Sequence, residues 1–210
     1  MLASATDRAA LHCHVRRCTT LAQNPKARIV QEAPRSSYEI GETRTLAQWL
    51  PNGRTTKLGD GQEFGPVIGP VALAGHFLAY ALFYFGRYND QGTDWKVVRL
   101  NVKTGHREEA NRSGSVGECT GGLAFHVPIP GVHKVVVTDM GAVAWLMQGR
   151  NDPQTGRLDP HDYRICALAS NSRTPVVLAS GSTIAPQSLA ASERYVYWTE
   201  GGVPRGVPIE

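Results

Sequence analysis

The segment that decides the fold reads Gly75-His76-Phe77-Leu78-Ala79-Tyr80. Two later segments, Met140–Trp145 and Glu193–Trp198, share its pattern of a turn, a short apolar run and a closing aromatic residue. A short apolar run of this kind, bounded by turn residues, is typical of a β-strand. Another apolar piece lies just upstream of each segment, at residues 71–73, 135–137 and 189–191. Each unit is therefore predicted to begin with a strand, a turn and a second strand.

Two of these units continue in the same way. Polar loops over residues 88–94 and 149–156 lead into third strands at Trp95–Leu100 and Tyr163–Leu168, and turn residues then lead into a fourth strand. Residues 45–58 resemble a further copy of the last hairpin alone, and the final unit stops after three strands. Four strands per repeating unit are typical of a propeller blade, which buries its faces against its neighbours.

The stretch Val67–Phe85 imitates a membrane helix, because it is almost entirely apolar over a length that could span a bilayer. Gly65-Pro66, Gly69-Pro70 and Gly75-His76 divide it into strand-sized pieces. The second piece also recurs in pattern where its surroundings are polar. We therefore interpret this stretch as buried strands with both faces apolar, and we expect no membrane insertion.

These patterns predict an all-β fold, a propeller-like array of about four antiparallel blades in one domain over residues 1–210; a β-sandwich is the alternative. Residues 1–10 are expected to be disordered. Because the final unit lacks an outer strand, residues 11–31 are expected to donate a strand and close a compact ring between the first and last blades. In a piece of a longer protein the ring would instead be open.

Composition supports a folded protein rich in strands. The 210 residues include 22 Gly and 13 Pro, and 19% of them are charged, which suits many short strands joined by tight turns. The net charge of +4 comes from scattered residues and not from a basic run with interleaved aromatics, so we expect no nucleic-acid partner.

Four cysteines, Cys13, Cys18, Cys119 and Cys166, allow three pairings into two disulfides in an oxidising compartment. Residues 1–10 lack the apolar core of a secretory signal. The protein is accordingly expected to be periplasmic or secreted if a signal was removed, and cytoplasmic otherwise. His12, Cys13, His14 and Cys18 are also of the types that bind zinc, although their spacing matches no zinc framework, and a disulfide or free thiols is the favoured interpretation.

Acidic residues gather in the polar loops that follow the second strands. We select four of them as candidate ligand-binding residues: Asp90, Asp94, Asp152 and Asp162. Their oxygens could bind calcium, but neither loop follows the regular calcium-binding pattern, and Asp and Asn are equally what tight turns need. The prediction is therefore no cofactor, with calcium and zinc as minor alternatives and no assigned metal ligands.

No catalytic motif of the common hydrolase, metalloprotease, phosphate-binding or dinucleotide-binding kinds is present, so we assign no catalytic residues. An acid/base set near a propeller axis remains the alternative, drawn from His76, His126, His133, His161, Asp139 and Glu193. The aromatic residues Tyr80, Trp145 and Trp198 recur in phase with the repeat, and we expect them to lie in the core between blades.

The repeat resembles bacterial propeller-repeat proteins, and it is similar in pattern to WD-repeat and periplasmic Tol-type propellers. The resemblance is carried by residues 73–81, 100–105 and 196–202, covers residues 43–210 as a repeat style, and lacks the Trp-Asp dipeptide of true WD repeats. It implies a scaffold, often secreted or periplasmic, with no single activity attached to it.

From this scaffold we predict a non-enzymatic binding or interaction module. Its partner would be an unidentified protein, a small molecule or a glycan, contacted by the variable polar loops. The alternative function is a propeller hydrolase or lyase that uses Asp, Glu or His chemistry near the axis.

Overall fold

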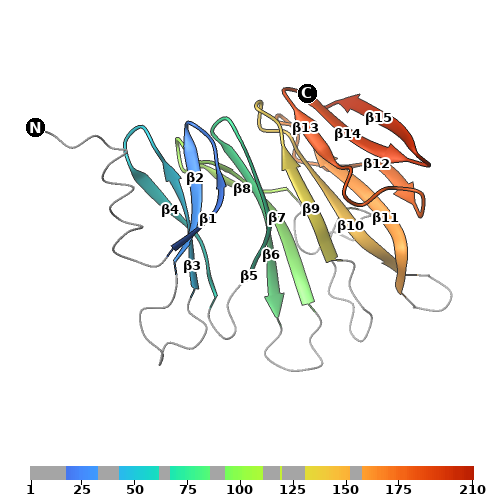
Figure 1. Ribbon diagram of the computed structural model, residues 1–210, viewed down its shortest axis with the longest axis horizontal. Helices are drawn as coiled ribbons and strands as arrows, with labels where there is room; N and C mark the ends of the chain where they lie inside the picture. The colour runs from blue at the N-terminus through green and yellow to red at the C-terminus, as the bar shows by residue number, and fades with distance from the viewer. Residues whose placement is uncertain are drawn as a thin grey trace, which may run out of the picture.

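The fold is all-β. The structure is a computed structural model that describes residues 18–32, 43–61, 67–85, 93–110, 119, 131–151 and 158–210. These residues form four antiparallel sheets, which we number 1 to 4 in chain order (Figure 1). None of them forms a helix with the length and apolar character needed to cross a membrane. Sheet 1 holds β1 (Cys18–Gln23), β2 (Ala27–Glu32), β3 (Thr43–Trp49) and β4 (Arg54–Gly61); sheet 2 holds β5 (Val67–Ala74), β6 (Phe77–Phe85), β7 (Thr93–Asn101) and β8 (Arg107–Glu109); sheet 3 holds β9 (Gly131–Val137), β10 (Val143–Asn151), β11 (Leu158–Leu168) and β12 (Val176–Gly181); sheet 4 holds β13 (Ala190–Ser192), β14 (Tyr195–Glu200) and β15 (Val203–Pro208).

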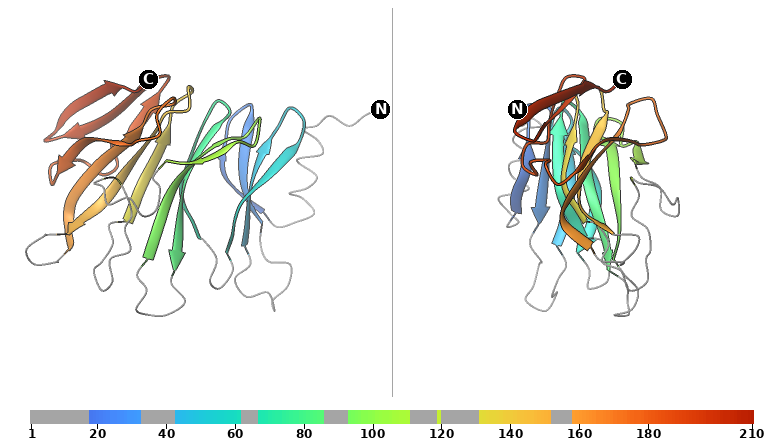
Figure 2. Two further views of the ribbon diagram at one scale, coloured as in Figure 1. Left: turned by 180° about the vertical axis from the view of Figure 1, so that it is seen from behind. Right: turned by 90° about the vertical axis from the view of Figure 1, so that its right-hand side faces the viewer.

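Each sheet is a simple meander, and the four sheets lie side by side in chain order, from left to right in Figure 1 and from right to left in the left view of Figure 2. The first strands of successive sheets contact one another: β1 contacts β5, β5 contacts β9, and β9 contacts β13. Meanders whose first strands come together are the arrangement of propeller blades. The predicted propeller-like array of about four antiparallel blades is confirmed.

The stretch that imitated a membrane helix is the hairpin β5–β6. Gly75 has a φ of 54° in the turn between the two strands, a left-handed conformation that glycine adopts without steric cost. On β6, Leu78, Ala79, Tyr80 and Ala81 are all fully buried, so successive residues on both faces are covered. The interpretation of Val67–Phe85 as strands is therefore confirmed, and the burial expected of them holds for β6, whereas β5 is only partly buried and its Val67 is 41% exposed.

A simple rule governs how one sheet packs on the next. The recurring aromatic residue faces the preceding sheet, whereas the residues beside it on the strand face the following sheet. Thus Trp145 of sheet 3 lies in one core cluster with Ala79 and Ala81 of sheet 2. In the same way, Trp198 of sheet 4 lies in a cluster with Ala142 and Ala144 of sheet 3.

This rule explains the recurrence that the sequence shows. Tyr80, Trp145 and Trp198 are 0%, 0% and 6% exposed, which confirms the prediction that they form the core between blades. Small side chains on the facing strand leave the room that each large ring fills, as close packing of protein interiors requires.

Sheet 1 differs from the prediction. It is a full four-stranded sheet and not a partial unit, because β1 pairs with β2 and β2 pairs with β3. The prediction that the segment 11–31 closes the ring is therefore wrong for residues 18–31, which are used within the first sheet; residues 11–17 lie outside the described part of the chain. Sheets 1 and 4 stand at opposite ends of the array in Figure 1. The expected disorder of residues 1–10 also concerns residues that are not described.

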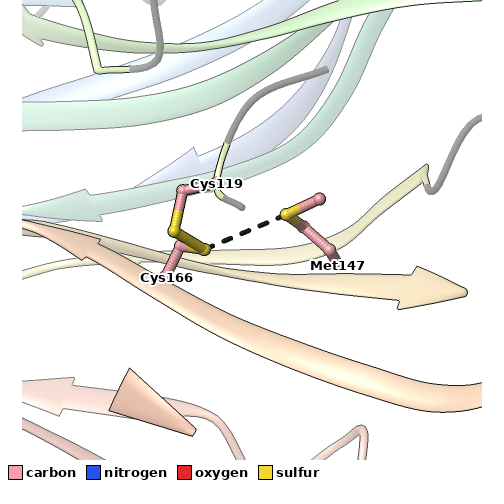
Figure 3. Close-up of a disulfide and its surroundings, with 3 residues drawn as sticks. All are labelled: Cys119, Met147 and Cys166. Carbon is pink, nitrogen blue, oxygen red and sulfur yellow. Dashed lines mark hydrogen bonds between the residues drawn. A yellow bond between two sulfur atoms is a disulfide. The ribbon is translucent and has the colours of Figure 1, made fainter. Parts of the chain in front are cut away.

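A buried disulfide joins Cys119, in the connection between sheets 2 and 3, to Cys166 on β11 (Figure 3). The Met147 sulfur lies 4.0 Å from the Cys166 sulfur within the same apolar cluster. Cys18 is disulfide-bonded as well, and none of the described cysteines is free. The Cys119–Cys166 bridge therefore attaches an otherwise long connection to the centre of sheet 3.

Removal of this bridge by Cys119→Ala with Cys166→Ala is expected to lower the free energy of unfolding by about 2–4 kcal/mol, because the bridge constrains the unfolded chain across a separation of 47 residues. Chemical denaturation followed by circular dichroism measures the change. Wild-type protein treated with reductant under denaturing conditions should lose at least as much, because reductant also opens the disulfide of Cys18. Equal stability of the oxidised wild type and the double variant would contradict a stabilising role.

Candidate binding face

The four acidic residues selected from the sequence lie in different surroundings. Asp90 and Asp152 fall outside the described residues. Asp94 belongs to β7, where it pairs with Tyr84 of β6, and the half-buried Asp162 belongs to β11. The prediction that Asp94 and Asp162 are loop residues is therefore wrong, because the third strands begin earlier than the polar sequence suggested. Their role in ligand binding stays a prediction.

The second strands of sheets 2 and 3 end, and their third strands begin, at one common end of the array. In Figure 1 the end of β6 and the start of β7 lie at the bottom, as do the end of β10 and the start of β11. This follows from the meander, because the second strand of each of these two sheets runs toward this end of the array and the third strand starts from it. Across the described ranges, no group of three or more His, Cys, Asp or Glu residues is placed to hold a metal ion.

The zinc alternative concerned four residues, of which the structure describes Cys18 alone. Its sulfur is in a disulfide, and a disulfide sulfur is not the thiolate that zinc binds. His12, Cys13 and His14 lie outside the described residues. The zinc and calcium alternatives accordingly stay predictions.

The residues of the alternative acid/base set are distributed over several sheets. His76, Asp139 and Glu193 lie in the first turns of sheets 2, 3 and 4, at the upper end of the array in Figure 1. His133 lies on β9 with a ring nitrogen 3.3 Å from the Gln187 amide nitrogen, and His161 lies on β11. His126 is not described.

The His76 imidazole lies at a junction of turns from sheets 1, 2 and 3. Partial burial lowers the pKa of this imidazole, the positive charges of Lys103 and Lys26 lower it further, and Asp139 acts in the opposite direction. The Trp49 ring stands edge-on to the imidazole with centroids 6.4 Å apart. His76 therefore favours the neutral form near neutral pH.

An exposed aromatic surface lies at the end of the array, on sheet 4. On β14 the rings of Tyr195 and Tyr197 are 41% and 42% exposed, and their centroids are 6.0 Å apart with planes 22° from parallel. The two side chains point away from sheet 3, because Val196 and Trp198 between and beside them pack into the sheet 3 cluster.

Strand pairing shows which residues share this surface. Tyr195 lies opposite Ser192 and Pro208, and Tyr197 lies opposite Ala190 and Gly206. Directly opposed residues in antiparallel strands present their side chains on one face. We call this surface the tyrosine face, and its members, all uncharged, are Ala190, Ser192, Tyr195, Tyr197, Thr199, Pro204, Gly206 and Pro208.

The tyrosine face departs from the packing rule of the other sheets. Tyr197 takes the place that Ala79 has in sheet 2 and Ala144 has in sheet 3, where the small side chain admits the large ring of the following sheet. Tyr195 stands where sheet 3 has Ala142 and sheet 2 has Phe77, which packs against the cluster between sheets 2 and 3. A following sheet with Trp in its aromatic position could not approach this face as sheets 3 and 4 approach theirs.

The replacement of alanine by tyrosine was the available sequence signal. The three aligned segments differ at this position, yet the sequence prediction rests only on the closing aromatic residue of each. An isolated strand shows a similar pattern whether or not a neighbouring sheet covers it, so the exposure of these rings emerged only from the packing.

The free edge of β15 is also specialised. Gly201 and Gly202, with φ of 57° and 79°, form the two-residue turn between β14 and β15, and Glu200 pairs with Val203 beside it. This turn geometry directs the N–H groups of Val203, Arg205 and Val207 toward β14 and those of alternate residues outward. Two of these alternate residues, Pro204 and Pro208, have no N–H. The outer edge of β15 therefore offers the Gly206 N–H as its single donor, which hinders addition of another strand.

Together these features define an all-β, propeller-like array that ends in an uncovered aromatic face. No protein-family model and no curated protein sequence matches the chain. Among solved structures, the Porphyromonas gingivalis dipeptidyl peptidase 4 is similar with a TM-score of 0.49 and 9% identity, over 87% of this chain and 34% of that one.

An ulvan lyase from a new family of polysaccharide lyases, in its saccharide-bound structure, is also similar, with a TM-score of 0.43 and 11% identity, over 86% of this chain and 48% of that one. A second structure of that lyase gives the same values. This chain spans less than half of the length of each of these proteins.

Proposed function

We propose that this chain is a non-enzymatic binding module whose ligand docks on the tyrosine face. The observation that carries the proposal is the pair of tyrosine rings, 41% and 42% exposed, at positions where sheet 3 has fully buried alanines. Aromatic rings on a firm backbone supply a large contact area at a small cost in conformational entropy, which is why Tyr is enriched in binding surfaces.

The supporting framework is rigid on its other side. Val196, at 0% exposure, and Trp198, at 6%, hold β14 against sheet 3, and Gly206 accommodates the edge of the Tyr197 ring. Both rings are therefore presented by a packed sheet and not by a loop, an arrangement that reduces the ordering cost of binding.

The test compares the wild type with Tyr195→Ala/Tyr197→Ala on four probes: a neutral polysaccharide, an acidic polysaccharide, a proline-rich peptide, and a second copy of the chain followed by sedimentation velocity. At least one probe is expected to bind the wild type and to be lost in the variant. Val176→Ala, which changes a side chain of β12 that is 56% exposed, serves as the matched control and should bind as the wild type does.

Two results would overturn the proposal. One is a panel in which no probe distinguishes the double variant from the wild type, because the tyrosine face would then have no part in binding. The other is a bound polysaccharide or peptide recovered in shortened form, because cleavage would establish the hydrolase or lyase alternative.

A further inference from the structure

We propose that turns of sheets 1 and 2 form a second binding site, which takes a phosphate or sulfate group. Its cations are Lys26, Arg54 and Lys103, which gather beside the imidazole of His76, and we call these four residues the cationic junction. The site is separate from the tyrosine face and does not depend on the function proposed for that face. It is carried by the convergence of the turns, by the absence of acidic partners for the cations and by the imidazole among them.

Hydrogen bonds between turns hold the junction in place. The side-chain amide of Asn24, in the turn between β1 and β2, donates to the Gly75 carbonyl oxygen at 3.0 Å. The Val102 N–H, in the turn between β7 and β8, donates to the His76 carbonyl oxygen at 2.9 Å. Both acceptors belong to the turn between β5 and β6. Three turns are therefore fixed to one another before a ligand arrives, which reduces the ordering cost of binding.

Two of these turns and the start of β4 each supply a cation. Lys26 lies between β1 and β2, and Lys103 lies between β7 and β8. Both are close enough for their charges to act on the His76 imidazole. A Cβ atom added at Gly105 would lie 2.6 Å from the Arg54 Nη2 atom. The guanidinium of sheet 1 therefore rests over the turn of sheet 2 that carries Lys103.

Strand pairing directs Arg54 toward the same side as the imidazole. Arg54 is paired with Trp49 across β3 and β4, and directly opposed residues in antiparallel strands present their side chains on one face. The Trp49 ring stands edge-on to the His76 imidazole with centroids 6.4 Å apart, so this face is turned toward sheet 2. The cations of the two sheets thus meet around one space.

The three cations are exposed and have no acidic partner. Within the described ranges, no carboxylate lies within ion-pair distance of Lys26, Arg54 or Lys103. Asp139, beside the turn between β5 and β6, is the acid whose charge acts on the imidazole. Three positive charges against one negative charge leave an excess of two, which a dianion would balance.

The donors also suit an oxyanion. An ammonium group offers three N–H donors and a guanidinium offers a planar fork, and both form short, strong hydrogen bonds to phosphate or sulfate oxygens. Donors that come from turns of two sheets approach from different directions, as the oxygens of a tetrahedral group require. The junction therefore fits a phosphate or sulfate group better than a flat carboxylate.

His76 couples binding at the junction to pH. Partial burial lowers the pKa of the imidazole, Lys103 and Lys26 lower it further, and Asp139 acts in the opposite direction. A bound dianion offsets the two lysine charges and favours the imidazolium, so it should raise the pKa of His76. Binding then takes up a proton. The affinity should therefore rise as the pH falls through the pKa of the bound state and level off below that of the free state.

Isothermal titration calorimetry with sodium sulfate at low ionic strength tests the site, because salt screens exposed charges. The wild type is expected to bind sulfate, and Lys26→Gln/Lys103→Gln should weaken the binding by about fivefold or more. Arg194→Gln/Arg205→Gln removes the same charge from sheet 4 and should bind as the wild type does. A wild type that binds no sulfate would overturn the proposal, and so would equal weakening in both double variants.

His76→Gln tests the role of the imidazole, with sulfate as the probe because it stays a dianion across the range used. Between about pH 8 and about pH 6 the affinity of the wild type should rise about threefold or more, whereas His76→Gln should lack this rise. An equal rise in His76→Gln would assign the proton to another group and contradict the coupling.

Two further titrations complete the test. Inorganic phosphate and phenyl phosphate distinguish the source of the group: equal affinities indicate a free ion, and tighter binding of the ester indicates a group carried by a larger molecule. Tyr195→Ala/Tyr197→Ala should bind sulfate as the wild type does, so failure of the tyrosine face and failure of the cationic junction are separate results. A loss of sulfate binding in this variant would contradict two separate sites.

Discussion

Replacement of Trp145 by alanine is expected to lower the free energy of unfolding by about 3–5 kcal/mol. The Trp145 ring is fully buried and lies between sheets 2 and 3, against the alanines of β6. Its removal leaves a cavity that neighbouring strands cannot fill, because strand pairing fixes their backbones. A loss of this size is a large part of the total stability of an ordinary domain.

Guanidinium denaturation followed by far-ultraviolet circular dichroism measures this loss without relying on the fluorescence of the deleted ring. Met140→Ala is the matched control, because Met140 is 60% exposed in the neighbouring turn and should change the stability by less than about 0.5 kcal/mol. A loss below about 1 kcal/mol for Trp145→Ala would show that the two sheets do not depend on this ring.

The same packing rule makes an opposite substitution informative. Ala144→Tyr would place in sheet 3 the residue that sheet 4 has at Tyr197, directly in the cluster that holds Trp198. Overpacking of this kind costs about 1–3 kcal/mol or more. An Ala144→Tyr variant as stable as the wild type would remove the reason for excluding a further sheet from the tyrosine face.

Replacement of Arg99 by methionine is expected to cost about 3–5 kcal/mol, because it removes the hydrogen bonds from a buried guanidinium of sheet 2 to two carbonyl oxygens of sheet 3 and breaks its ion pair with Glu108 within sheet 2. Arg99 on β7 is 9% exposed. Its Nη1 atom donates to the carbonyl oxygens of Gly141, at 2.9 Å, and Ala169, at 3.3 Å, while its Nη2 atom donates to the Glu108 carboxylate. The planar guanidinium thus satisfies acceptors in two sheets at once.

A lysine at position 99 tests whether the planar shape of the guanidinium matters in addition to its positive charge. Arg99→Lys keeps the positive charge but has no planar fork, so it should also lose much of the stability. The ion pair Lys96–Glu109 joins β7 to β8, as Arg99–Glu108 does, with a nitrogen–oxygen distance of 3.0 Å in a more exposed position. Lys96→Ala should therefore cost less than about 1 kcal/mol of stability. Equal stability of Arg99→Lys and the wild type would mean that charge suffices. Denaturation midpoints of the three variants provide the comparison.

Much of the fold was predictable from local patterns. The hairpins around Gly75 and Gly141, the third strands and the three-stranded final sheet all follow from short apolar runs bounded by turn residues. The first sheet was predicted only in part, because β1 has mostly exposed residues and gives a weak strand signal. Its place was decided by pairing with β2, whose alternate residues are buried under sheet 2.

The candidate site was harder to predict. Acidic residues next to the loops are natural candidates because of their chemistry, yet Asp94 and Asp162 are strand residues. The tyrosines of β14 look like ordinary strand residues in the sequence, since aromatic side chains are common in strands wherever they point. Recognising them as a surface required knowledge of which sheet faces were covered.

Local sequence patterns are enough to predict that this protein consists of strands, where most of the turns lie, and that the aromatic residues Tyr80, Trp145 and Trp198 belong to the core. Those properties depend on residues close together in the chain, through alternation, turn conformations and side-chain size. Three features follow from the packing of the sheets and not from local patterns: residues 18–31 complete the first sheet, Arg99 joins two sheets, and Tyr195 and Tyr197 stay exposed. Burial depends on which sheet lies opposite, and that neighbour is distant in sequence.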